Sequence, residues 1–168
     1  TVIQADIEAS NGIVHVVESV LRPSITDIVT THPSLDGLKT LVTAAEAGEG
    51  TPSIAAALDA ASSEGAWTLF APDNDAVASV TSPPADQALT NVLLYHAVAS
   101  VNPVYAADAL ALDNATVATA FAGHDIVVDG GTAVTITDET GADYTVTVAD
   151  LYAENGVIHV IDGVLLPD

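Results

Sequence analysis

A 19-residue stretch occurs twice in this chain, and it limits how the chain can be divided into folding units. Residues 149–167 read ADLYAENGVIHVIDGVLLP, and residues 5–23 read ADIEASNGIVHVVESVLRP. The two copies start 144 residues apart and agree at 10 of 19 positions. That spacing is far longer than a solenoid repeat and close to the length of one globular domain. The second copy is therefore expected to close a domain over residues 24–168, and residues 1–23 to be a terminal strand segment from the end of an upstream repeat.

The charge balance excludes two classes of partner. The chain has 23 Asp and Glu residues but only Arg22 and Lys39 as basic residues besides His, which gives a formal net charge of −21. Nucleic-acid binding needs cations that neutralise phosphates, and anionic lipid surfaces attract basic segments. The apolar runs are also much too short to span a bilayer, so neither nucleic-acid binding nor direct membrane insertion is expected. We interpret this acidic surface as an adaptation to salty or divalent-rich surroundings. A dedicated cation-binding surface is the less favoured interpretation.

Helical patterns fill the first half of the domain and strand patterns fill the second. Ser24, Ser34 and Asp73 are expected to cap helices, because their side chains accept hydrogen bonds from free N–H groups of the first turn. Two more helices are expected, one opening at Thr51-Pro52 and one running to about Val98. Strands are expected at 13–21, 66–71, 115–119, 125–128, 133–137, 143–148 and 157–166. Helices followed by strands predict an α+β domain.

Two histidines lie in apolar patterns and are interpreted as hydrogen-bonded core residues rather than as ligands or catalysts. His159 lies in a strand with apolar residues on both faces, and His96 continues an apolar helical stripe. Tyr95, one helical step from His96, is expected to reach a groove or the surface. The dipeptide Asn155-Gly156 is a turn signal, because both residues tolerate positive φ.

No residue pattern indicates catalysis or a cofactor. The five His residues are not paired at ligand spacing, and the chain has no HExxH, no P-loop and no Ser in a nucleophile-elbow context. The absence of Cys excludes disulfides and thiol chemistry. Weak calcium binding by Asp138, Glu139 and Asp143 stays open as an alternative. The prediction is a protein that is not an enzyme and has no cofactor and no metal site.

Three motifs, in order, resemble those of fasciclin-type domains. Residues 68–77 (TLFAPDNDAV) are similar to the family's first box, TxFAPTNEAF, and residues 91–96 (NVLLYH) to its central Tyr-His segment. Residues 155–167 are similar to the second box, NGxIHxIDxVLxP. Asp73 and Val77 depart from the usual first box, and the smaller Val predicts looser packing. The structural signature positions in this chain are Thr68, Phe70, Pro72, Asn74, Asn155, Gly156, His159 and Pro167.

This resemblance implies a fasciclin-like α+β fold, with helices packed around a β-sandwich or wedge. It also implies an extracellular or cell-surface (secreted) adhesion role, commonly in tandem arrays. In animal relatives the Tyr-His segment and an Asp-Ile pair before the second box are linked to integrin recognition. The matching positions here, which become candidate partner-binding residues, are Tyr95, His96, Asp150 and Leu151.

The expected function is that of a non-enzymatic cell-adhesion or matrix-interaction module. Its partner would be an extracellular matrix protein, a polysaccharide or another fasciclin domain. Self-association through residues 1–23 is also expected, because an isolated strand copy has affinity for sheet edges. The alternative is a rigid structural spacer repeat in a multidomain surface protein, which the short link Arg22-Pro23-Ser24 favours.

Overall fold

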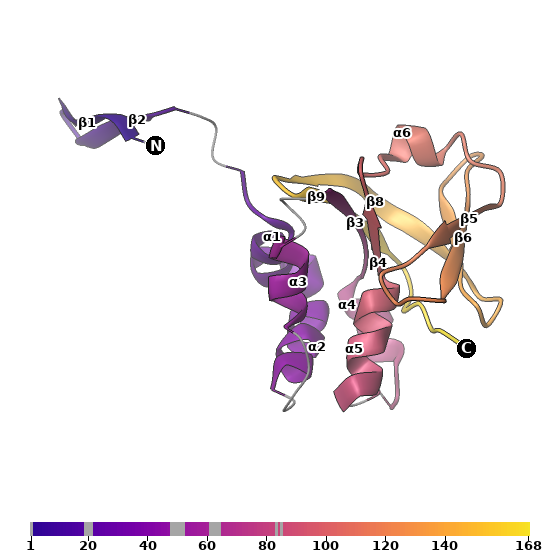
Figure 1. Cartoon of the computed structure of the whole chain (residues 1–168). Helices are drawn as coiled ribbons and strands as arrows, with labels where there is room; N and C mark the ends of the chain where they lie inside the picture. Colours follow the sequence, from indigo (N-terminus) through magenta and orange to yellow (C-terminus); the bar gives the residue numbers. More distant parts are fainter. Residues whose placement is uncertain (1, 19–21, 48–52, 61–64, 83, 85) are drawn as a thin grey trace.

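The computed structural model describes residues 2–18, 22–47, 53–60, 65–82, 84 and 86–168. An antiparallel hairpin of β1 (Val2–Ala9) and β2 (Gly12–Val17) comes first and forms a sheet of its own. Figure 1 shows this hairpin set apart from a helical layer and a strongly curved second sheet. The predicted strand at 13–21 thus matches β2 in part, and its last three residues lie outside the described residues.

The helices begin where local capping satisfies their first N–H groups. Ser24 Oγ accepts from Asp27 N at 3.1 Å and Asp27 Oδ2 accepts from Ser24 N at 3.0 Å, which makes a reciprocal capping box. Asp73 Oδ1 accepts from Ala76 N at 2.7 Å, so both predicted caps are confirmed. The helices are α1 (Ile25–Thr31), η1 (Pro33–Leu35), α2 (Asp36–Glu46), α3 (Ile54–Ala60), α4 (Asn74–Ser79), α5 (Asp86–Tyr95) and α6 (Ala106–Ala109).

The predicted cap at Ser34 is wrong. Residues 33–35 form a 3-10 turn, and α2 begins at Asp36 without a side-chain cap from the residue before it. Asn74 of α4 supplies an acceptor instead, because its Oδ1 accepts from Gly37 N at 2.9 Å. The start of α2 is therefore fixed by a tertiary contact. The predicted opening of the third helix at residues 51–52 lies outside the described residues, which show α3 from Ile54.

The second sheet has seven strands in the order β4-β3-β9-β8-β7-β6-β5. All neighbours are antiparallel except β3 and β9, which are parallel. The sheet curls until its two ends meet, where Ala120 N donates to Ala97 O at 2.7 Å. The strands are β3 (Ala66–Pro72), β4 (Ala97–Ser100), β5 (Ala115–Ala118), β6 (Asp125–Asp129), β7 (Thr135–Thr137), β8 (Asp143–Ala153) and β9 (Gly156–Ile161). The predicted α+β class is thereby confirmed.

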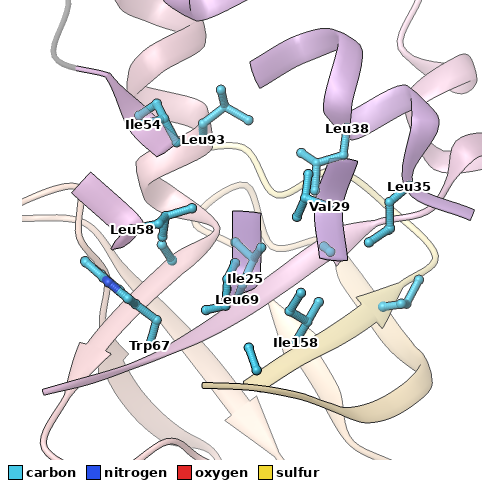
Figure 2. Packing of buried hydrophobic residues seen from close by; sticks show 14 of the residues in the cluster. Ile25, Val29, Leu35, Leu38, Ile54, Leu58, Trp67, Leu69, Leu93 and Ile158 are labelled. Carbon is cyan, nitrogen blue, oxygen red and sulfur yellow. The ribbon is translucent and has the colours of Figure 1, made fainter. Parts of the chain in front are cut away.

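Strand β9 lies between two hydrophobic cores. All six of its residues are buried, as the sequence predicts for a strand covered on both faces. Ile158 and Val160 belong to a core shared with the helices, in which Figure 2 shows side chains of α1, α2, α3 and α5 over β3 and β9. Ile161 belongs to a second core inside the curled sheet. Each such Ile or Val stabilises the fold by about 1.5–3 kcal/mol, so β9 holds both layers together.

Beyond β2, three elements end three or more residues away from the predicted position. The helix expected to run to Val98 ends at Tyr95, because residues 97–100 form β4 and pair with β3. Strand β8 continues to Ala153 instead of residue 148, through a bulge at which its register against β9 shifts. The last strand ends at Ile161 instead of residue 166. In each case strand pairing decided the boundary over local periodicity.

Gly156 is required by close packing, not by a turn with positive φ. Neither Asn155 nor Gly156 is among the residues with positive φ, so that part of the turn prediction is wrong. A Cβ built on Gly156 would lie 2.1 Å from the carbonyl oxygen of Trp67 on β3. Glycine is thus needed at this position because the parallel strand lies directly against it.

We expect Gly156→Ala to lower the free energy of unfolding by at least about 3 kcal/mol, because backbone atoms cannot yield to the new methyl group. The matched control is Gly12→Ala at the same position of the N-terminal copy, where nothing lies within 4 Å of the added Cβ. That variant should change stability by less than about 0.5 kcal/mol. Urea denaturation measures both, and equal effects would show that β9 does not approach β3 as described.

Candidate interaction site

The candidate residue Asp150 lies at the bulge of β8, held in place by β9. Its φ is 57°, a left-handed conformation, and the register between β8 and β9 shifts between Val148 and Leu151. His159 Nδ1 accepts from Asp150 N at 3.4 Å, while His159 Nε2 lies 2.8 Å from Val104 O and must donate to it. The bulge is therefore fixed by a buried histidine, and the prediction that His159 is a hydrogen-bonded core residue is confirmed.

The surface around this bulge combines a carboxylate with two tyrosines. Asp150 is 27% exposed, and its Oδ1 accepts from Ala106 N, at the start of α6, at 2.9 Å. The rings of Tyr105 and Tyr152 lie with their centroids 5.6 Å apart, and Tyr152 is 59% exposed. Leu151 instead packs half-buried against the helical core. Sequence reasoning missed both tyrosines, because the exposure of Tyr152 depends on the bulge that turns β8.

The other two candidates, Tyr95 and His96, are core residues. Tyr95 is fully buried, so the expectation that it reaches a groove or the surface is wrong. Its hydroxyl donates to Asp125 O at 2.9 Å and accepts from Glu139 N at 3.1 Å. These two bonds connect α5 to the start of β6 and to the turn after β7. Among the described residues, no hydrogen bond, ion pair or ring contact joins Tyr95 or His96 to Asp150 or Leu151. A partner that touched all four would have to open the fold.

Burial sets the ionisation of both residues. Burial raises the pKa of the Tyr95 hydroxyl to about 12. Burial also lowers the pKa of His96 to about 4, against the smaller opposing effect of the Val92 carbonyl. His96 Nδ1 lies 2.7 Å from Val92 O, and Nε2 accepts from Leu165 N at 2.9 Å. These two contacts need the neutral ring with its proton on Nδ1, so the core interpretation of His96 is confirmed.

Asn155 joins the two layers at the beginning of β9. It is 4% exposed, its Oδ1 accepts from Ile25 N at 2.9 Å, and its Nδ2 donates to Leu58 O at 3.1 Å. Its backbone oxygen accepts from Trp67 N at 3.0 Å. The side-chain amide thus satisfies the first turn of α1 and a carbonyl of α3, while the backbone carbonyl of the same residue pairs with the start of β3. The sequence indicated only a turn at this residue.

The remaining signature residues also hold elements together. Thr68 is fully buried and its Oγ1 accepts from Val104 N at 2.8 Å. The ring of Phe70 stacks on that of His159 with 5.7 Å between centroids. Asn74 Nδ2 donates to the carbonyl of residue 33 at 2.9 Å. Pro72 is buried at the end of β3 and Pro167 is half-buried near the C-terminus.

The N-terminal hairpin reproduces the bulge of the C-terminal copy. Asp6 has φ of 56°, and its backbone N donates to His15 Nδ1 at 3.2 Å. These are the positions of Asp150 and His159 in the other copy, so the repeat extends from sequence to backbone geometry. The surroundings differ completely, because β9 is buried throughout and all six residues of β2 are exposed.

We expect Asn155→Ala to lower the free energy of unfolding by about 3 kcal/mol, because a buried donor and a buried acceptor lose their partner. Asn11→Ala, the same change in the exposed hairpin copy, is the control and should stay within about 0.5 kcal/mol of the parent. Thermal or urea unfolding distinguishes the two. A loss of equal size in both would contradict the bridging contacts described here.

Stability should fall as the pH falls from about 6.5 to about 4, because of His96. The folded pKa lies below the unfolded one, so over this range the unfolded chain binds a proton that the folded chain does not. His96 alone accounts for about 3 kcal/mol of this loss, and its effect levels off below its folded pKa. The measurement is the free energy of unfolding between about pH 6.5 and about pH 4 in the parent and in His96→Gln, and the variant should lack this part of the pH dependence. An NMR titration that gives His96 an ordinary pKa would contradict the prediction.

The described part of the chain contains no group of three or more His, Asp or Glu residues placed to hold a metal ion. None of the described helices combines the length and the apolar character needed to cross a membrane. The bulge surface offers a carboxylate, a buried histidine behind it and two tyrosine rings tilted against each other. These groups suit hydrogen bonding and stacking with a partner.

Comparisons with known proteins agree with the motifs. The model of the fasciclin domain matches residues 36–167. Protein sll1483 from Synechocystis sp. is 32% identical over 157 residues, which cover 83% of this chain and 79% of that protein. Among solved structures, a FAS1 domain pair from the insect cell adhesion molecule Fasciclin I matches with a TM-score of 0.67 and 20% identity. That match covers 98% of this chain and 59% of the insect chain, and it shows likeness of fold alone.

Fasciclin domains are typically adhesion-related modules, generally non-enzymatic and typically extracellular or surface-associated. The family model covers well over half of the residues, and the curved sheet, the helical layer and the buried signature residues agree with it. This chain belongs to the fasciclin domain family.

Proposed function

We propose that this chain is a non-enzymatic, extracellular or cell-surface adhesion module that binds another fasciclin-domain chain through the hairpin β1–β2. The observation that carries this proposal is the exposure of the hairpin's apolar residues. Val2, Ile3, Ile13 and Val14 are each more than half exposed. Val16 and Val17 of the same hairpin are 38% and 39% exposed. Exposed apolar side chains gathered on one pair of strands are typical of an interaction site.

The surroundings of β9 in the C-terminal copy indicate what kind of partner β2 can bind. Strand β9 has β8 on one side and a parallel strand, β3, on the other, and it is covered on both faces. Strand β2 has β1 on one side and no further strand among those described. In a second copy β3 is already paired with β4 and β9, whereas β2 keeps one unpaired edge among the described strands, so β2 is taken as the partner strand. Two hairpins joined edge to edge would form a four-stranded sheet around a two-fold axis.

A matrix protein or a polysaccharide is the other class of partner that the surface chemistry supports. Exposed Tyr152 offers an aromatic face to a sugar ring or an apolar side chain, and Asp150 offers a carboxylate oxygen to a hydroxyl or N–H group. The hairpin carries no second such pair, because Glu8 stands where Tyr152 stands in the C-terminal copy. Binding of this class would therefore depend on the bulge of β8 and would persist without the hairpin.

The second candidate function is a rigid spacer, and one backbone contact favours it. Glu154 N, in the turn between β8 and β9, donates to Pro23 O at 2.9 Å. This bond fastens the segment that follows the hairpin to the body of the domain just before α1. X-ray scattering from a two-domain chain tests it, because a freely tumbling pair of domains would contradict a spacer role.

The adhesion proposal predicts that Val14→Thr combined with Val16→Thr abolishes concentration-dependent association. Threonine keeps the strand shape and removes apolar surface, so the fold should persist while pairing weakens. Val148→Thr, an exposed valine of β8 that is 44% exposed, is the matched control and should associate like the parent. Sedimentation at high ionic strength is the measurement, because salt screens the repulsion between strongly acidic chains.

Three outcomes of this experiment are informative. Loss of association in the double variant alone supports pairing through the hairpin. Equal association in all three chains contradicts it. A parent chain that stays monomeric but binds in matrix or glycan arrays also contradicts hairpin pairing, and assigns the adhesion role to the other surface.

A further inference from the structure

The helical layer encloses an apolar cavity that the adhesion role does not use. It has a volume of about 110 Å³ and lies between α1, α2, α3, α5 and the strands β3 and β4. Most of its wall is aliphatic, with Val29, Leu38, Ile54, Leu58 and Leu93 among the lining residues. Figure 2 shows these side chains converging from the helices above β3. An engineered apolar cavity of about 150 Å³ takes up benzene, so this one has room for a short hydrocarbon segment.

The cavity reaches the surface along α2. Its wall also includes Lys39, Thr43 and Glu46, which are exposed residues on that helix. Glu46 Oε1 accepts from Ser53 Oγ at 2.8 Å and from Ala55 N at 3.2 Å, so this carboxylate fixes the beginning of α3 beside the opening. A molecule can thus place one end inside and project the rest past these polar residues.

The charges at the opening favour an uncharged ligand. Lys39 and Glu46 give one charge of each sign, and the interior beyond them is apolar. An anion would also meet the field of a chain with a formal charge of −21. A cation or an anion would lose its hydration inside the cavity without a buried counter-charge.

Trp67 contributes a hydrogen-bond donor to this mostly apolar wall. The indole lines the cavity and is 9% exposed, and Figure 2 shows it extending from β3 toward Leu58 of α3. Its Nε1 is buried and has no hydrogen-bond partner among the described residues. Buried donors are normally paired, and an unpaired one invites a ligand oxygen.

We propose that this cavity binds the hydrocarbon end of an uncharged lipophilic molecule that carries an oxygen acceptor, such as a medium-chain ketone, aldehyde or ester. The alkyl chain displaces the empty volume between α2, α3 and β3. The oxygen accepts from Trp67 Nε1, which moves slightly to meet it. This is a second binding function, on the helical layer and away from the hairpin β1–β2.

Trp67 is the only tryptophan, so its side-chain N–H gives one NMR signal that reports on the cavity directly. We expect methyl hexyl ketone to shift this signal downfield in a saturable manner in isotope-labelled protein. Ala57→Phe places a ring in the cavity wall and should weaken binding at least about tenfold, which corresponds to about 1.4 kcal/mol. Ala56→Phe is the matched control, because the neighbouring Ala56 is exposed and does not line the cavity, and it should bind like the parent.

Octanoate, of equal chain length but charged, should bind at least about tenfold more weakly than the ketone. Thermal unfolding verifies that each variant is folded, and Val42→Phe blocks the cavity from α2 if Ala57→Phe does not fold. The proposal is overturned if the parent shows no saturable shift with the ketone, or if a folded blocking variant binds like the parent. Octanoate that binds as tightly would overturn the uncharged class of ligand. Saturation seen at other signals but not at Trp67 would overturn the role of the indole.

Discussion

The parallel pairing of β3 with β9 is the contact on which the rest of this domain depends. It joins Trp67 to Gly156 and Pro72 to Ile161, bringing together segments about half the chain apart. The helical core packs on one face of this pair and the core of the curled sheet on the other. Because β9 is buried on both faces, its hydrogen bonds and side chains are protected from water at every position. Loss of this strand would open both cores together.

Buried polar side chains in and around this pairing connect the layers. Asn155 satisfies backbone groups of α1 and α3, His96 bridges α5 to the C-terminal segment, and His159 fixes the bulge of β8. Each is buried, and each uses its hydrogen-bonding side-chain atoms on backbone groups. Such contacts add modest stability individually, but they allow few alternative arrangements of helices over the sheet. The family motif residues therefore stabilise the fold, and the exposed groups beside them are the ones available to bind partners.

Much of this architecture could be predicted from the sequence, and the failures share one cause. The α+β class, the caps at Ser24 and Asp73 and the core positions of His96 and His159 follow from local patterns, which the structure confirms. The end of α5, the extension of β8 and the burial of Tyr95 depend on which strand or loop lies alongside. Periodicity along the chain carries no information about that neighbour. The cavity beside Trp67 could not be predicted from the sequence either, because residues of four helices and two strands line it together.

The separation between β3 and β9 along the chain also has a consequence for folding. Strand β3 ends at Pro72 and β9 begins at Gly156, so during synthesis one edge of β3 lacks its native neighbour until the residues between them have been made. Contacts of such long sequence separation form late and slowly, because a large loop must close first. Strand β2 carries a closely similar sequence and precedes β3 in the chain, so a competing strand for β3 is present before β9 is made. Pairing of β2 with β1 in its own hairpin reduces this competition.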